Sequence, residues 1–294
     1  MNYNGLVVVN AKNASFNAGF DGLPRRLPSG RIFATDKALK YCLREYLSKK
    51  EPVFVQRTKE FHKKSNEDEV VERYLTLKEN YFKKCDKGAL PKDESEIISD
   101  LKGFIDVRLF GVVFAISGDD TRNISMTGPC QINYGVNRLD GSNIYSSDIL
   151  SPYRNPNEKS QDAQKTTIGN EARADDVYYV YDICLNMNSA EKQGIKVSDD
   201  DIKKLKNALK YAVGEITSTT MFGCETVSTL WFKNKNDRIF NNLNSLVDVY
   251  ESEGEMIVDY SKVIDIIKEE IIDDSLEQYS NKVKNIYSLE SSEK

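Results

Sequence analysis

The sequence predicts an α+β fold whose core runs strand, helix, strand, strand, helix, strand, interrupted by two insertions. Three observations predict it. Short apolar runs rich in β-branched and aromatic residues recur along the chain, amphipathic segments with helical spacing separate them, and two long stretches contain few large aliphatic residues. This order is typical of ferredoxin-like and RNA-recognition-motif (RRM) folds. An apolar content of 39% is sufficient for a substantial core.

The first strand and helix lie in the amino-terminal fifty residues. Leu6–Ala11 is short and rich in β-branched residues, as expected of a buried strand. Residues 13–31 contain many Gly, Pro and Asn residues and predict an irregular loop. Thr35 or Asp36 is a suitable N-cap for a helix that ends near Leu47.

Residues 51–103 differ in composition and predict an inserted helical lobe. Lys and Glu are frequent, and large apolar residues are sparse. Glu69–Phe82 has helical spacing, and Ser95–Gly103 reads as a short amphipathic helix.

The longest apolar run of the chain follows this lobe. Phe104–Ile116 predicts a central strand from Val107 onward, covered on both faces of the sheet. Ser125–Val136 is a second candidate strand in this part of the chain. Residues 140–175 are then polar and without a clear period, which favours an extended excursion that becomes ordered against a partner.

The remaining core elements are more regular. Val177–Met187 and Val227–Phe232 predict strands, and a helix runs between them from Ser198 to about Ile216. Acidic residues in its first turn and lysines further on suit the helix dipole. A hairpin over residues 246–260 and an amphipathic helix after Ser261 complete the prediction.

At 294 residues, the chain is long enough for two domains or for one domain with large insertions. We expect a core made of residues 1–50, 104–139 and 176–294, a helical lobe at 51–103 and an excursion at 140–175. No apolar run approaches the ~20 residues that span a bilayer, and the amino terminus lacks the pattern of a secretory signal. The expected location is therefore the cytoplasm, without membrane contact.

Cysteine and histidine usage argues against common catalytic and metal sites. The five cysteines are widely spaced and form no C-x-x-C pair, and His62 is the only histidine. Zinc sites and His-dependent nucleophilic catalysis are thus disfavoured. We expect no metal and no cofactor.

Positive charge is concentrated near the amino terminus. The first fifty residues carry nine Lys or Arg against three Asp or Glu, whereas the whole chain has a net charge of −5. Lys37, Lys40 and Arg44 share one helical face, and Arg25 and Arg26 precede it in the loop. Guanidinium pairs, loop glycines and a helix start favour phosphate binding. A solvated helix face remains the alternative.

Two other segments can be interpreted either as functional sites or as ordinary structural elements. Gly128–Arg138 mixes a strand with amides, a tyrosine and an arginine, and it is either an ordinary strand and turn or a surface that stacks on bases. Asp119 and Asp120 are either paired acids for metal chemistry or a solvated turn. Glycine-rich mononucleotide motifs are absent from the sequence.

Several of these motifs together resemble one protein family. Asn13, Asn17, Pro24-Arg25, Gly30 and residues 35–47 resemble the amino-terminal pattern of the CRISPR-associated backbone (DevR-like, CRISPR-associated seven) subunits of type I Cascade complexes. Asp106–Gly111 is similar to a second family signature, and Gly128–Ile132 resembles the strand before the family's thumb. The likeness spans nearly the whole chain.

The resemblance implies a right-hand shape with an RRM-like palm, inserted helical fingers and an extended thumb. It implies a noncatalytic subunit that binds CRISPR guide RNA (crRNA) and oligomerises along it, and the subtype I-B members of the family fit best. Target DNA would be recognised through guide pairing, beside other Cascade subunits. A metal-dependent ribonuclease of the same fold that uses Asp106, Asp119 or Asp120, and a protein-interaction module, are the alternatives.

The residues expected to bind RNA fall into two groups. For the phosphates we expect five cations: Arg25, Arg26, Lys37, Lys40 and Arg44. Further candidates are Asn13, Asn17, Arg108, Asn133, Arg138 and, within the thumb, Lys165.

Overall fold

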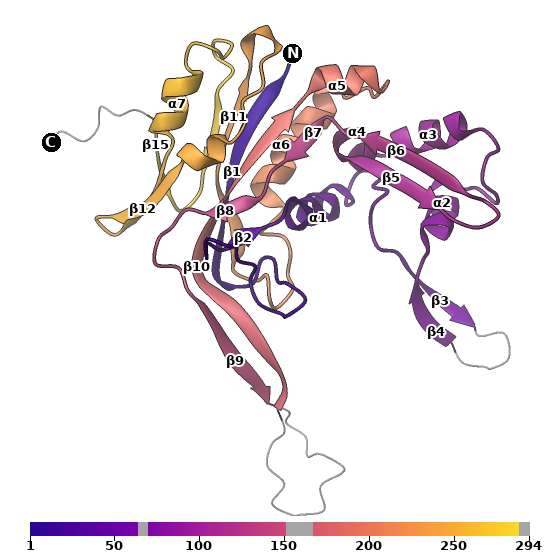
Figure 1. Ribbon diagram of the computed structural model, residues 1–294, viewed down its shortest axis with the longest axis horizontal. Coiled ribbons are helices and arrows are strands. Elements are labelled where there is room, and N and C mark those ends of the chain that lie inside the picture. Colours follow the sequence, from indigo (N-terminus) through magenta and orange to yellow (C-terminus); the bar gives the residue numbers. More distant parts are fainter. Residues whose placement is uncertain (64–69, 151–166, 288–294) are drawn as a thin grey trace, which may run out of the picture.

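The computed structural model describes residues 1–63, 70–150 and 167–287, and its centre is a mainly antiparallel sheet (Figure 1). The strand order in this sheet is β14-β11-β1-β10-β8-β2, and β7 and β9 also pair with β10. The bounds are β1 Tyr3–Ala14, β2 Phe33–Ala34, β7 Cys130–Ile132, β8 Gly135–Asn137, β9 Ile144–Leu150, β10 Thr167–Leu185, β11 Cys224–Lys233 and β14 Glu277–Ser280.

The central strand is β1, which pairs with β10 on one side and β11 on the other. In the predicted order of core strands, β1 is the first, β10 the third and β11 the fourth, so the third and fourth strands flank the first. The short strands β7 and β8 take the place of the second core strand and pair with β10. Close packing requires glycine at two places in this sheet. A Cβ at Gly5 would lie 2.3 Å from the Trp231 ring, and one at Gly135 would lie 2.4 Å from the Tyr181 ring.

Two helices cover one face of the sheet, as the sequence predicts. The Thr35 side chain caps α1 (Asp36–Leu47), and Ser198 forms a capping box at the start of α6 (Asp199–Tyr211). Buried side chains of both helices share one core with Val7, Val9 and Tyr179 of the sheet. The short α5 (Met187–Lys192) follows β10.

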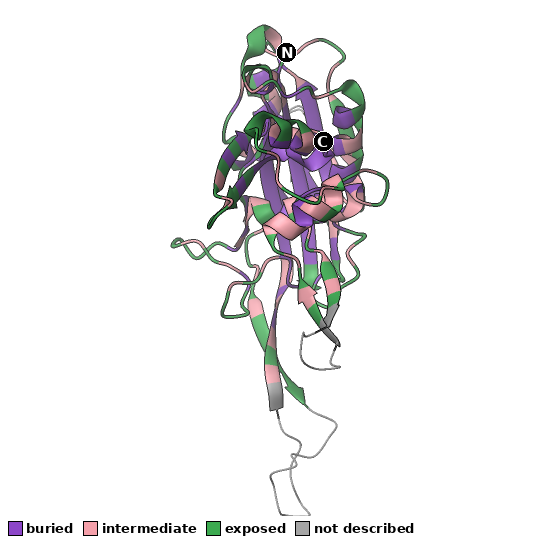
Figure 2. Ribbon diagram, turned by 90° about the vertical axis from the view of Figure 1, so that its right-hand side faces the viewer, coloured by how far each residue is buried: buried purple, intermediate pink, exposed green. Residues whose placement is uncertain are grey.

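The carboxy-terminal segment covers the other face of the sheet. It forms a three-stranded sheet of β12 (Asp248–Ser252), β13 (Glu255–Asp259) and β15 (Lys284–Ile286), with α7 (Ser261–Ile267) and two short 3₁₀ turns at Lys235–Asp237 and Leu243–Leu246. Its apolar side chains pack on Leu6, Val8 and Val180. Figure 2 shows the main sheet buried between these layers. No open sheet face is left for a ligand in the described part of the chain, so only the edges of the sheet can contact one.

A second lobe with its own core lies beside α1 (Figure 1). It contains helices as well as two small two-stranded sheets, β3–β4 and β5–β6. The bounds are β3 Lys59–Lys63, β4 Val70–Tyr74, α2 Leu77–Cys85, α3 Glu94–Lys102, α4 Ile105–Phe110, β5 Gly111–Ile116 and β6 Arg122–Thr127. The predicted helix at Ser95–Gly103 is confirmed, whereas half of the one at Glu69–Phe82 is strand β4.

The prediction of a central strand from Val107 onward was wrong. Residues 105–110 form a helix, and β5 pairs only with β6, outside the main sheet. The helix is buried between two cores, because Ile105 and Leu109 face the core of the main sheet and Val107 faces the core of the lobe. Ile105, Val107 and Leu109 alternate with Asp106 and Arg108, and this period of two is typical of a strand.

The polar segment after residue 140 also has more regular structure than expected. β9 pairs in antiparallel fashion with the first part of β10, and the two form a long ribbon that projects from the sheet (Figures 1 and 2). Most side chains of β9 are exposed. At the base of the ribbon, the Asn143 N–H donates to the Asp175 side chain, and the Asp175 N–H donates to the Asn143 carbonyl.

None of the described helices is long and apolar enough to cross a membrane.

Candidate nucleic-acid interface

The loop before α1 has a defined conformation at the edge of the sheet. Short bridges join Ala18 to Pro24 and Arg26 to Ile32. The Asn17 side-chain oxygen accepts hydrogen bonds from the Thr35 N–H at 3.0 Å and from its hydroxyl at 3.1 Å. Asn17 therefore ties the loop to the cap of α1, which makes it a positioning residue in this structure.

Two arginines of this loop line a groove of about 740 Å³. Arg25 and Arg26 lie there with Phe20 and Phe33, next to the base of the β9–β10 ribbon. Within the described residues, neither guanidinium has a carboxylate partner: the Arg25 Nε is buried without a hydrogen bond, and an Arg26 Nη donates to the Gly30 carbonyl at 2.9 Å. Unpaired donors of this kind are suited to phosphate oxygens.

A second pair of arginines lies at the neighbouring β2–β8 edge. Arg138 is half-buried, and its Nε has no partner among the described residues. Burial, and then the positive charge of Arg31, lower the pKa of Arg138. Arg31 itself approaches Asp140 at 3.4 Å. Asp140 pairs with Arg31, and Asp248 offsets part of the charge of Arg138. Two cations held close together would be stabilised further by a bound anion.

Aromatic rings lie beside these cations. Phe33 and Tyr134 stack with ring centroids 5.3 Å apart. Tyr134 remains exposed, and Phe20 is fully exposed at the rim of the groove. Tyr134 is the tyrosine of the Gly128–Arg138 segment, for which the sequence left base stacking open, whereas Phe20 and Phe33 were not predicted. Their signal was the interleaving of aromatic residues with arginines, which is typical of surfaces that bind single-stranded nucleic acid.

Asn13 lies at the base of the ribbon in the left-handed conformation, with φ of 49°. Its carbonyl accepts from the Arg173 guanidinium at 2.9 Å, and its side chain accepts from the Tyr145 hydroxyl at 3.2 Å. Asn13 thus joins the end of β1 to both strands of the ribbon.

The three cations on α1 do not have equivalent surroundings. The side chain of Lys37 is 82% exposed, but those of Lys40 and Arg44 are only 13% and 16% exposed. Lys40 pairs with Asp36 at 3.1 Å, and Arg44 pairs with the buried Asp106 at 3.0 Å. Lys37 is the most exposed of the three, and its Nζ lies 3.5 Å from Asp36 Oδ1.

The other predicted residues are spread over the molecule. Arg108 donates to both oxygens of Asp201, at 3.1 and 2.7 Å, and to two backbone carbonyls. Asn133 is exposed, and its side chain accepts from the Tyr134 N–H. Lys165 lies outside the described residues.

The acidic candidates have structural partners. Asp106 is fully buried and accepts from the N–H groups of Phe54 and Val55, at 2.7 and 2.9 Å, as well as from Arg44. Asp120 pairs with Lys78, and Asp119 is exposed. No group of three His, Cys, Asp or Glu side chains that could hold a metal occurs among the described residues.

The cysteines lie apart from the arginine groove. Burial raises the pKa of the Cys42, Cys130 and Cys224 thiols to about 12, so they stay protonated near neutral pH.

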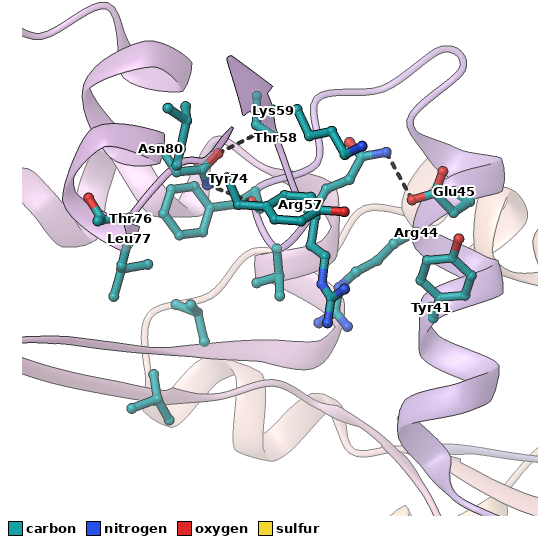
Figure 3. A pocket seen from close by; sticks show the side chains of 16 residues that line it. Tyr41, Arg44, Glu45, Arg57, Thr58, Lys59, Tyr74, Thr76, Leu77 and Asn80 are labelled. Atoms are coloured by element: carbon teal, nitrogen blue, oxygen red, sulfur yellow. Dashed lines mark hydrogen bonds between the residues drawn. The ribbon is translucent and has the colours of Figure 1, made fainter. Parts of the chain in front are cut away.

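A cleft that the sequence analysis missed separates α1 from the second lobe (Figure 3). Tyr41, Arg44 and Glu45 of α1 line one side, and Arg57 and Tyr74 line the other. The volume of the cleft is about 880 Å³.

Comparison with known proteins shows to which family the chain belongs. Residues 1–268 match the family described as CRISPR-associated protein Cas7. The chain belongs to the Cas7 family. This match confirms the resemblance to CRISPR-associated backbone proteins that the motifs indicate.

Solved structures with similar folds carry related descriptions. A chain of a structure described as "CRISPR RNA-guided surveillance complex, pre-nicking" is 12% identical, with a TM-score of 0.58, and the alignment covers 98% of this Cas7 chain and 96% of the other. A chain described as "CRISPR RNA-guided surveillance complex" is 11% identical, with a TM-score of 0.49, and covers 86% and 77%. At 12% identity, the likeness to the first of these structures shows the fold alone. A search of curated proteins finds no match.

Proposed function

We propose that this Cas7 protein is a noncatalytic backbone subunit that binds crRNA and oligomerises along it in a type I Cascade complex, with subtype I-B as the closest fit to the motifs. The observation that carries the proposal is the arginine surface, which we define as Arg25, Arg26, Arg31 and Arg138. Three of these guanidiniums have no carboxylate partner within the described chain. Such a surface holds phosphates regardless of base sequence, so that base pairing can select the DNA target.

In this proposal, the parts of the fold act as a hand. The palm is the main sheet with the two layers that cover it, and the fingers, expected at 51–103, are the second lobe, which continues through β5 and β6 to Thr127. The thumb is assigned to residues 140–175. RNA would cross the palm at the arginine surface and Lys37. The thumb would reach the RNA segment of the neighbouring copy. Asn13 supports this arrangement, because it links the loop to the base of the ribbon.

The partners in the proposal are crRNA, target DNA paired to it, further copies of the chain and other Cascade subunits, in the cytoplasm. Residues 235–294 carry fourteen acidic against seven basic residues. Residues 235–287 of this segment lie on the face of the sheet away from α1 and α6 (Figure 1), so we assign the segment to solvent or to a basic surface of a neighbouring subunit.

The first experiment identifies the nucleic acid that copurifies with the protein when it is expressed with its complex partners. Sequencing should give short RNAs of uniform length with repeat-derived ends. A copurifying mixture of unrelated cellular RNA would count against a guide-binding subunit.

The alternative is a metal-dependent ribonuclease. Asp106 is already engaged by three donors, and Asp120 is paired, so the geometry favours the scaffold. Incubation of the protein with labelled RNA, with and without Mg²⁺ or Mn²⁺, should show binding without cleavage. Metal-dependent cleavage that Asp119→Ala abolishes would overturn the proposal.

A further inference from the structure

Three aspartates are buried among the described residues, and one of them lacks a counter-charge. Asp106 pairs with Arg44 at 3.0 Å, and Asp201 pairs with Arg108 at 2.7 Å. Asp182 is only 6% exposed, yet no Lys or Arg side chain of the described residues pairs with it. A buried carboxylate without a cation is costly, because the protein interior does not replace the water that solvated its charge. A cation from outside the described residues would remove this cost.

The carboxylate of Asp182 is engaged on one oxygen only. Its Oδ2 accepts from the Leu243 N–H at 3.1 Å, whereas its Oδ1 has no hydrogen-bond partner among the described residues. Burial raises the pKa of Asp182 to about 6, so the group is mostly ionised at neutral pH. An asparagine has nearly the same shape and would avoid the cost of the buried charge. A charge that lowers stability in this way is typical of a binding site.

Asp182 lines a pocket of about 260 Å³, where β7 and β10 meet the chain that precedes the 3₁₀ turn at Leu243–Leu246. Four neutral side-chain amides also line it: those of Gln131, Asn133, Asn241 and Asn242. The Gln131 side-chain N–H donates to the Gly128 carbonyl at 2.7 Å, so the Gln131 oxygen can accept from a ligand. The pocket therefore combines one negative charge with several uncharged acceptors.

The remaining walls of the pocket are uncharged. Ile132 and Phe240 are buried apolar side chains, and they offer a surface for methylene groups. Cys184 is the other titratable side chain that lines the pocket, and burial raises the pKa of its thiol, so it is neutral near pH 7. The volume is below the range of roughly 300–1,000 Å³ that sites for drug-sized ligands occupy. The pocket thus fits a small ligand or a single side chain.

The donor set selects among the possible cations. A guanidinium is bound best by both oxygens of a carboxylate, but Asp182 Oδ2 already accepts from Leu243. A divalent metal ion prefers several charged oxygen ligands, and the described residues hold no group of three His, Cys, Asp or Glu side chains that could bind one. A compact ammonium group needs one anionic oxygen and a few neutral acceptors, and its aliphatic stem packs on apolar side chains.

We propose that this pocket binds a primary alkylammonium group, with Asp182 as the counter-charge, the Gln131 amide oxygen as a further acceptor and Phe240 as the surface for the methylene stem. The group belongs either to a free alkylamine or to a lysine side chain of another polypeptide. The inference does not depend on RNA binding, because none of the residues of the arginine surface lines the pocket.

The test measures binding of n-butylammonium chloride to the purified full chain at neutral pH by isothermal titration calorimetry. n-Butanol is the uncharged probe of the same length. Asp182→Asn removes the charge, and the exposed Asp119→Asn is the control with the same change in charge. The wild type and Asp119→Asn should bind n-butylammonium equally, and Asp182→Asn should bind it at least about tenfold more weakly. n-Butanol should bind to the wild type more weakly by a similar factor. Thermal melting confirms that both variants are folded.

Four results would overturn the inference. They are no binding of n-butylammonium by the wild type, equal binding by Asp182→Asn, equal binding of n-butanol, and Mg²⁺ binding that is tighter than that of n-butylammonium and is lost in Asp182→Asn. The last result would assign the pocket to a metal ion.

A second arm separates the two sources of the ammonium group. The protein is purified together with its partners and treated with a carbodiimide, which joins a carboxylate to a neighbouring amine. An amide between Asp182 and a lysine of another polypeptide, found by mass spectrometry, assigns the group to a protein partner. Binding of n-butylammonium to the assembled complex as tightly as to the free chain assigns it to a free amine instead.

Discussion

Arg44 is a cation on α1 whose main contact is inside the protein. Its pair with Asp106 lies where α1 meets the second lobe, and Asp106 is fully buried. Arg44→Ala would leave a buried carboxylate without its counter-charge. We predict a loss of about 3 kcal/mol in the free energy of unfolding, measured by urea denaturation. The double variant Arg44→Ala/Asp106→Asn should recover part of this loss. A change below about 0.5 kcal/mol in the single variant, the size usual for surface substitutions, would contradict the structural role.

Asp182 is a buried carboxylate whose Oδ1 has no partner among the described residues. Burial raises its pKa from 3.8 to about 6, against the opposing hydrogen bond from the Leu243 N–H. The folded state therefore binds the proton more tightly than the unfolded state. The stability from this group is fully present below pH 4 and is lost as the pH rises through about 6.

Asp182→Asn should remove this dependence. Relative to the wild type, the variant should gain about 2 kcal/mol of unfolding free energy between pH 4 and pH 7. Parallel urea titrations at several pH values measure the difference, and the exposed Asp119→Asn serves as a control. A wild-type-to-variant difference that stays constant with pH would refute the prediction.

Substitution of Arg25 and Arg26 tests directly whether the arginine surface contacts RNA phosphates. Arg25→Gln/Arg26→Gln should weaken RNA binding equally for unrelated sequences. It should reduce the slope of log affinity against log salt by about 1.4, because each phosphate contact on a single strand contributes ~0.7. Fluorescence anisotropy at several salt concentrations measures both effects.

The matched control is Lys192→Gln/Lys196→Gln. Both lysines are exposed, and they follow the end of β10 that pairs with the start of β1, far from the loop after β1. This control should keep the wild-type slope. If both double variants show the same slope of log affinity against log salt, the arginine surface does not contact RNA.

At the residue scale, the sequence predicted which cations lie close together along the chain, but not which of them pair with a carboxylate in the folded protein. Lys37 and Arg44 share a helical face, yet the partner of Arg44 lies 62 residues further along. Arg108 is held by Asp201, 93 residues away. Such long-range pairing leaves no local signal in the sequence. The exposed Arg57 and Tyr74 were missed because their segment reads as a plain charged lobe.

At the element scale, the β9–β10 ribbon can be shortened without touching the core. The side chains of residues 145–150 on β9 are exposed, and Ala172 is the buried one among residues 169–173 of β10. The bonds between Asn143 and Asp175 close the base of the ribbon. We predict that replacing residues 146–172 by Asn-Gly, a two-residue turn joining the paired Tyr145 and Arg173, leaves the melting temperature within a few degrees of the wild type. Cooperative assembly on long RNA should be lost.

Thermal melting and sedimentation with RNA check the two parts of this prediction separately. Global unfolding of the shortened chain would show that the ribbon belongs to the core. Unchanged cooperative assembly would show that copies contact one another elsewhere.

Elements with strong local signals were predicted well. The caps of α1 and α6 follow from Thr35 and Ser198, and the predicted strands at Leu6–Ala11 and Val227–Phe232 fall within β1 and β11. The exposed β9 was missed because its apolar residues stand as adjacent pairs at its two ends, Ile144-Tyr145 and Ile149-Leu150, and do not alternate with polar ones. The helix α4 was taken for a strand because its apolar and charged residues alternate from Ile105 to Leu109.

At the scale of the whole molecule, sequence order was sufficient to predict the main features of the sheet. The strands β11, β1, β10 and β8 are the fourth, first, third and second core strands, and they lie side by side in that order. This arrangement is expected of the predicted order of strands and helices. The hairpin and helix of the carboxy-terminal segment were predicted, but their position on the second face of the sheet was not. No local feature of their sequence indicates where they pack. This segment buries the second face of the sheet, and we propose that RNA binds instead at the edge with the arginine surface.

The central claim is that guide RNA lies on this edge, and ultraviolet crosslinking tests it most directly. The complex is purified with its RNA and irradiated, and the modified peptides are identified by mass spectrometry. We predict adducts within residues 15–37 and near Arg138. Adducts confined to α5, α6 or the carboxy-terminal segment, with the loop before α1 unmodified, would contradict the account.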